Sequence, residues 1–175
     1  THKGENQACI VFCANVQHAE DIAALFSRNG IPAAAIHSRG LRSEERTRRI
    51  EAFKHGQIKI LTNFNVLTEG FDAPATKLVV LARPTTSGVA LAQMVGRGTR
   101  LDKDTNKTEV IIIEIADSRI RYRTLGVGAL FDLAPDFNAQ GASLTDVQDA
   151  LHAVQHVFKE HTLPLNRITE TRQVI

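Results

Sequence analysis

Two arginines three residues apart, Arg97 and Arg100, lie in the stretch Gln93-Met94-Val95-Gly96-Arg97-Gly98-Thr99-Arg100. Glycine lets a backbone approach a ligand closely, and each arginine presents a planar fork of donors that suits phosphate. Gln93 stands one helical turn before Arg97. The pattern predicts a phosphate-binding loop. The alternative is a helix end whose basic residues offset the helix dipole.

A second polar stretch runs from Asn63 to Asp72 and reads Asn-Phe-Asn-Val-Leu-Thr-Glu-Gly-Phe-Asp. Gly70 allows the backbone to approach a phosphate or a ribose. Asp72 can accept hydrogen bonds from hydroxyl groups or orient an arginine. The alternative is that Asp72 and Pro74 only shape a turn.

Arginines are also concentrated on a helix that we predict from Arg42 to Lys54. Two glutamate–arginine pairs four residues apart are typical of a solvated helix surface. Arg46 differs because it lies along the apolar stripe with Ile50 and Phe53, where a charge needs a buried partner or a bound anion. The residues from His37 to Arg39, just before this helix, could contact a nucleic-acid backbone.

Strand-like and helix-like segments alternate around these motifs. Strands are predicted at residues 8–13, 33–36, 58–62, 77–82 and 109–115, and helices at residues 16–29, 42–54 and 87–95. The alternation predicts an α/β fold, a parallel sheet with helices on both faces. Ligands of such sheets bind at the carboxyl ends of the strands, so we expect the loops at 63–72 and 96–100 to lie at that edge.

The character of the chain changes after Asp117, where we place a domain boundary between residues 1–117 and 118–175. The second part begins as an irregular connector with clustered arginines and glycines. From Ser143 to His161 the apolar residues recur at helical spacing, and Thr145 with Gln148 resembles a capping box. We therefore expect a small helical C-terminal extension that packs through one stripe.

The overall composition of the chain says less about its function than the positions of its charged residues do. The 175 residues are 43% hydrophobic and 23% charged, with a formal net charge of only +2, so a nucleic-acid surface would need local clustering of basic residues. No apolar run is long enough to span a bilayer, and we expect no membrane partner. Cys9 and Cys13 sit in an apolar stretch without further ligands, which favours buried thiols, no metal site and a reducing, cytoplasmic location.

Taken in order, the motifs resemble the C-terminal RecA-like motor domain of superfamily-two helicases, in the DEAD/DEAH-box and type III restriction Res-subunit group. The resemblance covers roughly residues 8–117. Ile10 to Cys13 resembles motif IV, His37 with Arg46, Ile50 and Phe53 resembles motif IVa, residues 61–72 resemble motif V, and Gln93 to Arg100 resembles motif VI. Several motifs in the right order are much more specific than any one.

This resemblance implies a nucleotide site. Arg97 and Arg100 would act as catalytic arginine fingers on the γ-phosphate of ATP. Gln93 would support their loop, and Gly70, Asp72 and Gly96 would lie beside the nucleotide. The implied cofactor is ATP with magnesium, held mainly by a separate N-terminal motor domain.

The resemblance also implies a nucleic-acid partner. Together with the polar residues at the predicted strand ends, it gives a predicted nucleic-acid surface of His37, Arg39, Thr62, Asn63, Asn65 and Thr68. Many DEAD-box members have glutamine where this chain has Ser43, and motif V reads Thr-Glu-Gly-Phe-Asp rather than Ala-Arg-Gly-Ile-Asp. These departures favour DNA over RNA.

The sequence contains no Gly-x-x-x-x-Gly-Lys-Ser/Thr phosphate loop and no Asp-Glu metal-binding box. We therefore expect a fragment of a longer ATP-dependent helicase that is inactive alone and completes its site with an N-terminal motor domain. The rival hypothesis is a non-catalytic nucleic-acid-binding module that keeps the fold but has lost ATPase activity. The presence of Arg97, Arg100, Gln93 and Asp72 in one chain favours the motor.

Overall fold

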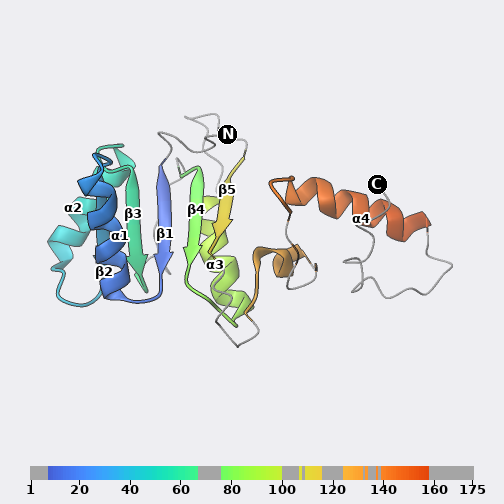
Figure 1. The fold of residues 1–175 in the computed structure, drawn as a ribbon, viewed down its shortest axis with the longest axis horizontal. Coiled ribbons are helices and arrows are strands. Elements are labelled where there is room, and N and C mark those ends of the chain that lie inside the picture. The colour runs from blue at the N-terminus through green and yellow to red at the C-terminus, as the bar shows by residue number, and fades with distance from the viewer. Residues whose placement is uncertain are drawn as a thin grey trace.

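A five-stranded parallel sheet forms the centre of the molecule (Figure 1). The computed structural model describes residues 8–66, 76–99, 107, 109–115, 124–131, 133, 137 and 139–157. The strands are β1 (Cys9–Cys13), β2 (Ala33–His37), β3 (Ile60–Phe64), β4 (Leu78–Ala82) and β5 (Ile111–Glu114), in the spatial order β2-β3-β1-β4-β5. Every neighbouring pair is parallel, which confirms the predicted α/β class.

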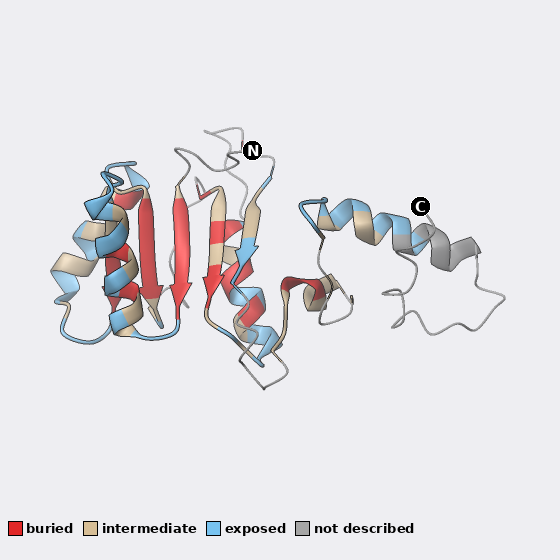
Figure 2. Ribbon diagram, viewed as in Figure 1, coloured by how far each residue is buried: buried red, intermediate tan, exposed pale blue. Residues whose placement is uncertain are grey.

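Helices cover both faces of this sheet, as predicted. The helices over the sheet are α1 (Val16–Arg28), α2 (Ser43–Lys54) and α3 (Gly88–Gly98). They are followed by a short 3₁₀ helix η1 (Val127–Phe131) and by α4 (Leu144–Val157), which contacts η1. Alternate residues of a strand point to opposite faces, so Ile10 of β1 packs in the cluster with α2 and α3. Its neighbour Val11 packs in the cluster with α1. Figure 2 shows β1 and β3 buried and the edge strand β5 more exposed.

Local signals explain where α1 begins and where α1 and α2 end. The Asn15 side chain accepts a hydrogen bond from the amide of His18 at 2.8 Å and so caps α1. Gly30 and Gly56 follow the ends of α1 and α2 with φ of 78° and 71°, a conformation that glycine adopts without a steric penalty.

The course of α3 differs from the prediction. We expected a helix that ends at Val95 and a loop from Gly96, but α3 continues to Gly98. The reason is that Met94, Val95 and Gly98 bury one continuous face of the helix.

The direction of α3 corrects a second expectation. A helix that follows a parallel strand runs back along the sheet, so α3 ends beside the amino ends of β4 and β5. Gly98 accordingly packs against Val79, near the start of β4, and Val110, just before β5. The prediction that residues 96–100 lie at the carboxyl edge is therefore wrong for the described part, residues 96–99.

Residues beyond the expected boundary at Asp117 contribute to the same core. Val127 of η1 is 4% exposed and belongs to the cluster beneath α3. Its amide donates to a carboxylate oxygen of Glu114 at 2.9 Å, which ties η1 to β5. The burial of Glu114 raises the pKa of its carboxyl group.

The last described helix, α4, confirms the predicted helical extension, although its cap is different. The amide of Asp146 donates to the hydroxyl of Ser143 at 3.3 Å, so Ser143 and not Thr145 caps the helix. Ser143 directly precedes the first helical residue, whereas Thr145 already lies inside the helix. The predicted residues 158–161 lie outside the described part of the chain. None of the described helices is long and apolar enough to cross a membrane.

Candidate functional site

The last two turns of α3 carry three of the predicted nucleotide-site residues, Gln93, Gly96 and Arg97. Gln93 is exposed, and it shares a helix face with Arg97 because the two are four residues apart. Apart from its chain neighbours and the backbone of its own helix, no described heavy atom lies within 4 Å of the position that a Cβ atom would take on Gly96. The structure therefore brings these residues together on a helix end with open space beside its backbone.

Close packing and two side-chain hydrogen bonds fix this helix end. A Cβ atom on Gly98 would lie 2.4 Å from a methyl carbon of Val79 and 2.9 Å from one of Val110, so only glycine fits. The buried ammonium of Lys107 donates to the Gly98 carbonyl oxygen. The Thr99 hydroxyl donates to the carbonyl of Gly96 at 3.4 Å. Carbonyls that the helix leaves without internal partners are thus bound by side chains.

Lys107 is a residue that the sequence reasoning missed. It follows Gly98 by nine positions and has no motif signal, because lysine before a strand is commonplace. Only its burial, with 7% of the residue exposed, reveals it. The other predicted nucleotide-site residues, Gly70, Asp72 and Arg100, lie outside the described residues.

At the opposite edge of the sheet, three predicted nucleic-acid residues are directed into the domain. Nε2 of His37 lies 3.0 Å from a carboxylate oxygen of Glu20 on α1. The Thr62 hydroxyl donates to the carbonyl of Ala19 at 2.7 Å, and Thr62 has no exposed surface. Asn63 is 2% exposed. In this arrangement none of the three presents a surface on which nucleic acid could bind.

The remaining described members of that predicted surface, Arg39 and Asn65, are exposed. Asn65 directly follows β3, and its φ of 54° is a left-handed conformation that asparagine tolerates. Its side-chain oxygen accepts a hydrogen bond from the guanidinium of Arg83 at 2.8 Å. Since β1 lies between β3 and β4, this bond spans the carboxyl end of β1. Thr68 lies outside the described residues.

Arg83 was not predicted, although a signal exists: it directly follows β4, as Asn65 follows β3.

Arg46, predicted to need a partner or an anion, is partly buried. Within the part of the chain that the structure describes, its side chain has no hydrogen-bond or ion-pair partner. The expectation of an anion at Arg46 remains a prediction.

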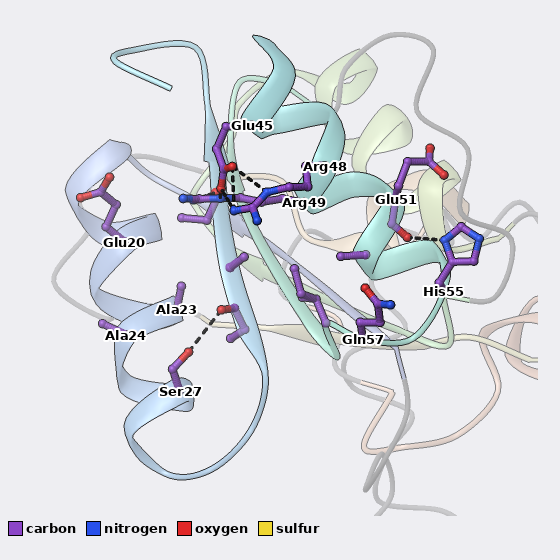
Figure 3. A pocket seen from close by; sticks show the side chains of 15 residues that line it. Glu20, Ala23, Ala24, Ser27, Glu45, Arg48, Arg49, Glu51, His55 and Gln57 are labelled. Atoms are coloured by element: carbon purple, nitrogen blue, oxygen red, sulfur yellow. Dashed lines mark hydrogen bonds and ion pairs between the residues drawn. The ribbon is translucent and has the colours of Figure 1, made fainter. Parts of the chain in front are cut away.

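A groove of about 910 Å³ lies between α1, α2 and the edge strand β2 (Figure 3). Arg49 donates to the carbonyl of Ala35 at 2.7 Å and to Glu45 at 2.7 Å, and Arg48 donates to the same carboxylate. Hydrogen bonds from Arg48 and then Arg49 lower the pKa of Glu45 to about 2. No predicted site residue lines the groove. Its polar groups hold α2 against β2, which is a structural role.

Both cysteines are buried free thiols, as predicted. Desolvation raises the pKa of Cys9 to about 12 and that of Cys13 to about 11. The thiols are therefore protonated at neutral pH and are poor nucleophiles. Neither thiol contributes to the candidate site.

Comparison with known proteins identifies the class. Residues 1–102 match the sequence model of the family described as "Helicase conserved C-terminal domain". The match covers more than half of the chain, and the chain belongs to this family. The fold of the sheet and the order of the motifs agree with this assignment.

Individual proteins show the same similarity. The putative mitochondrial ATP-dependent helicase irc3 of Schizosaccharomyces pombe is 36% identical over 135 residues, which is 77% of this chain and 22% of that protein. A fragment of a putative HsdR subunit of a type I restriction enzyme from Vibrio vulnificus YJ016 is 31% identical, with a TM-score of 0.55 over 67% of this chain and 25% of the other.

A third similar protein is an S. cerevisiae Dbp5 variant bound to RNA and ADP BeF3. It is 26% identical, with a TM-score of 0.53 over 63% of this chain and 29% of the other. In all three comparisons this chain corresponds to less than a third of the related protein.

Proposed function

We propose that this chain is the second motor domain of an ATP-dependent nucleic-acid helicase or translocase. ATP with magnesium would be held mainly by an N-terminal motor domain, and Arg97 and Arg100 would reach its γ-phosphate from this chain. The observation that carries the proposal is the fixed end of α3, where Arg97 stands beside the open backbone of Gly96. Family membership and a relative named as an ATP-dependent helicase support it.

The arginines would act in the reaction step more than in binding. Negative charge is redistributed over the transferring phosphoryl group in the transition state, and an arginine placed there stabilises it. This chain has no phosphate-loop motif of its own. The charge of Arg97 would therefore reach phosphate only when the two motor domains close.

The carboxyl edge of the sheet would carry the nucleic acid. Arg39 and Asn65 are exposed there, and Arg83 holds the Asn65 side chain in place. Guanidinium and amide groups bind phosphate oxygens without reading sequence. Thr68 stays part of this proposed surface. His37, Thr62 and Asn63 would join it only after their present internal contacts change.

We propose DNA as the preferred nucleic acid because this chain departs from the DEAD-box pattern at Ser43 and in the Thr68-Glu69-Gly70-Phe71-Asp72 stretch. The Dbp5 variant is bound to RNA, so the preference for DNA rests on the residues of this chain. A direct competition between single-stranded DNA and RNA of one sequence, followed by fluorescence anisotropy, decides the point. Tighter binding of RNA would overturn the preference.

The test of the motor is kinetic and uses the complete protein with both motor domains. Arg97→Ala and Arg100→Ala should each lower kcat for nucleic-acid-stimulated ATP hydrolysis on the order of a thousandfold, with a much smaller change in ATP affinity. Arg100→Lys should not rescue, because an ammonium does not reproduce the planar fork. Arg48→Ala, an exposed arginine on α2, is the matched control and should keep full kcat.

Two results would contradict the motor. If Arg97→Ala and Arg100→Ala leave kcat intact, the arginines are structural. If the complete protein binds nucleic acid but hydrolyses no ATP, the chain belongs to a non-catalytic binding module.

A further inference from the structure

We propose that Lys107 is a positioning residue for Arg97, acting through the end of α3. The inference rests on the proposed function, since it assigns how one proposed arginine finger is aimed. It starts from the buried ammonium of Lys107, which is bound to the carbonyl oxygen of Gly98. That carbonyl belongs to the residue directly after Arg97.

The placement of Lys107 has an electrostatic reason. A buried ammonium is costly unless hydrogen bonds and charge compensate for lost water. The end of a helix concentrates partial negative charge on carbonyls that lack internal partners. Lys107 meets part of this requirement at the C-terminus of α3, where it binds a carbonyl that the helix leaves without an internal partner.

Gly98 is held from two directions. Its missing Cβ allows the helix to approach Val79 and Val110, which sets the distance between α3 and the sheet. The bond from Lys107 reaches its carbonyl and resists rotation of the last peptide units. Together the two contacts define both the distance and the orientation of the turn that carries Arg97.

A small change in this turn has a large effect at the end of the arginine side chain. The guanidinium is separated from its backbone by several bonds, so a slight rotation of the turn displaces it substantially. Displacement of a reacting group by about 1 Å can cost about a hundredfold in rate. Lys107 is itself buried, so we assign it a role through Arg97 and not a contact with phosphate.

The experiment measures hydrolysis in the complete protein for Lys107→Met, which keeps an apolar stem of similar length and removes the charge. We expect kcat to fall about a hundredfold while ATP affinity and nucleic-acid affinity change by less than about threefold. Lys107→Arg keeps a cation and should recover most of kcat. Lys54→Met, which removes an exposed lysine from α2, is the matched control and should leave kcat unchanged.

A double-variant cycle separates positioning from other roles. When Arg97 is already alanine, adding Lys107→Met should lower kcat no further, because nothing is left to aim. A further large loss in the double variant would mean that Lys107 acts on its own, and would overturn the inference. Unchanged kcat in Lys107→Met would overturn it too.

Loss of folding is distinguished by a second measurement. If Lys107→Met unfolds, the cycle is run with Lys107→Arg, whose smaller kcat deficit should also vanish on the Arg97→Ala background. A deficit that persists there would contradict positioning. The proposed motor fails separately, when Arg97→Ala alone leaves kcat intact.

Discussion

The two ends of α3 differ in how their surroundings are built. At its start, the carboxyl edge of the sheet carries an exposed hydrogen-bonded polar pair, Asn65 with Arg83. At its end, the amino edge is made by close packing around Gly98, with the buried ammonium of Lys107 on its carbonyl. We expect the first arrangement to exchange its hydrogen-bond partners for a ligand and the second to hold one geometry.

This difference suits the two proposed roles. A surface that tracks a nucleic-acid backbone must release and remake contacts, and hydrogen bonds at an exposed edge allow that. An arginine that serves a transition state must be held in one position before the reaction. The eleven residues of α3 span about 16 Å between the two edges. One helix would therefore link the nucleic-acid side to the nucleotide side.

The largest structural effect should come from Gly98, which has no room for a methyl group. Gly98→Ala should lower the free energy of unfolding by about 1–3 kcal/mol, because the helix end is pushed away from Val79. Gly96→Ala is the matched control on the same turn. It should keep the stability or raise it by up to about 1 kcal/mol, because Gly96 has space and alanine favours helix.

Urea unfolding of the purified chain, followed by circular dichroism, measures both variants. Equal stability of the two would remove the evidence that packing fixes this edge. The comparison becomes sharper in the complete protein, where ATP would use the space beside Gly96. There Gly96→Ala should impair hydrolysis despite its intact fold.

A smaller effect on stability should come from the groove beside β2. Because we assign this groove a structural role only, it serves as a control for the carboxyl and amino edges of the sheet. Hydrogen bonds from Arg48 and Arg49 lower the pKa of Glu45 from 4.5 to about 2. A carboxylate with a lowered pKa stabilises the fold fully above about pH 4.5, and this contribution is lost as the pH falls toward 2. Glu45→Gln should therefore flatten the loss of stability over that range.

Thermal unfolding between pH 2 and pH 7 at low and high salt measures this effect. The difference from the unmodified chain should shrink with salt, because these groups are in contact with solvent. Activity and nucleic-acid affinity of Glu45→Gln should stay normal at neutral pH. A loss of activity or of nucleic-acid affinity in Glu45→Gln would show that the groove is a functional site. The comparison of the carboxyl and amino edges would then leave out one functional region.

Much of the fold could be predicted because the local signals were strong. The cap at Asn15, the glycines after α1 and α2 and the apolar strands all act through neighbouring residues. The start of β3 was predicted two residues early because Ile58 looks like a strand residue. Its amide instead bonds back to Ala52, so the chain is still finishing the turn after α2.

The site was harder to predict because its key contacts are distant in sequence. Glycine near arginine suggested a loop, but Gly98 is needed inside a helix for contact with Val79, nineteen residues earlier. Similarly, nothing in the sequence shows that Thr62 bonds to Ala19 or that Lys107 bonds to Gly98. In the site, the residue types indicated the kind of chemistry. The direction and the burial of each side chain depended on the order of the strands in the sheet, which brings distant residues together.

The most direct measurement is a crossed assay of the two edges in the complete protein. ATP hydrolysis and nucleic-acid affinity at several salt concentrations are measured for Arg97→Ala and for Arg83→Ala combined with Asn65→Gly, which keeps the left-handed backbone. Arg97→Ala should lose hydrolysis and keep nucleic-acid affinity. The double variant should bind less tightly, with a salt slope smaller by about one unit per lost phosphate contact, and recover hydrolysis at saturating nucleic acid. Equal loss of both activities in both variants would contradict two separate edges.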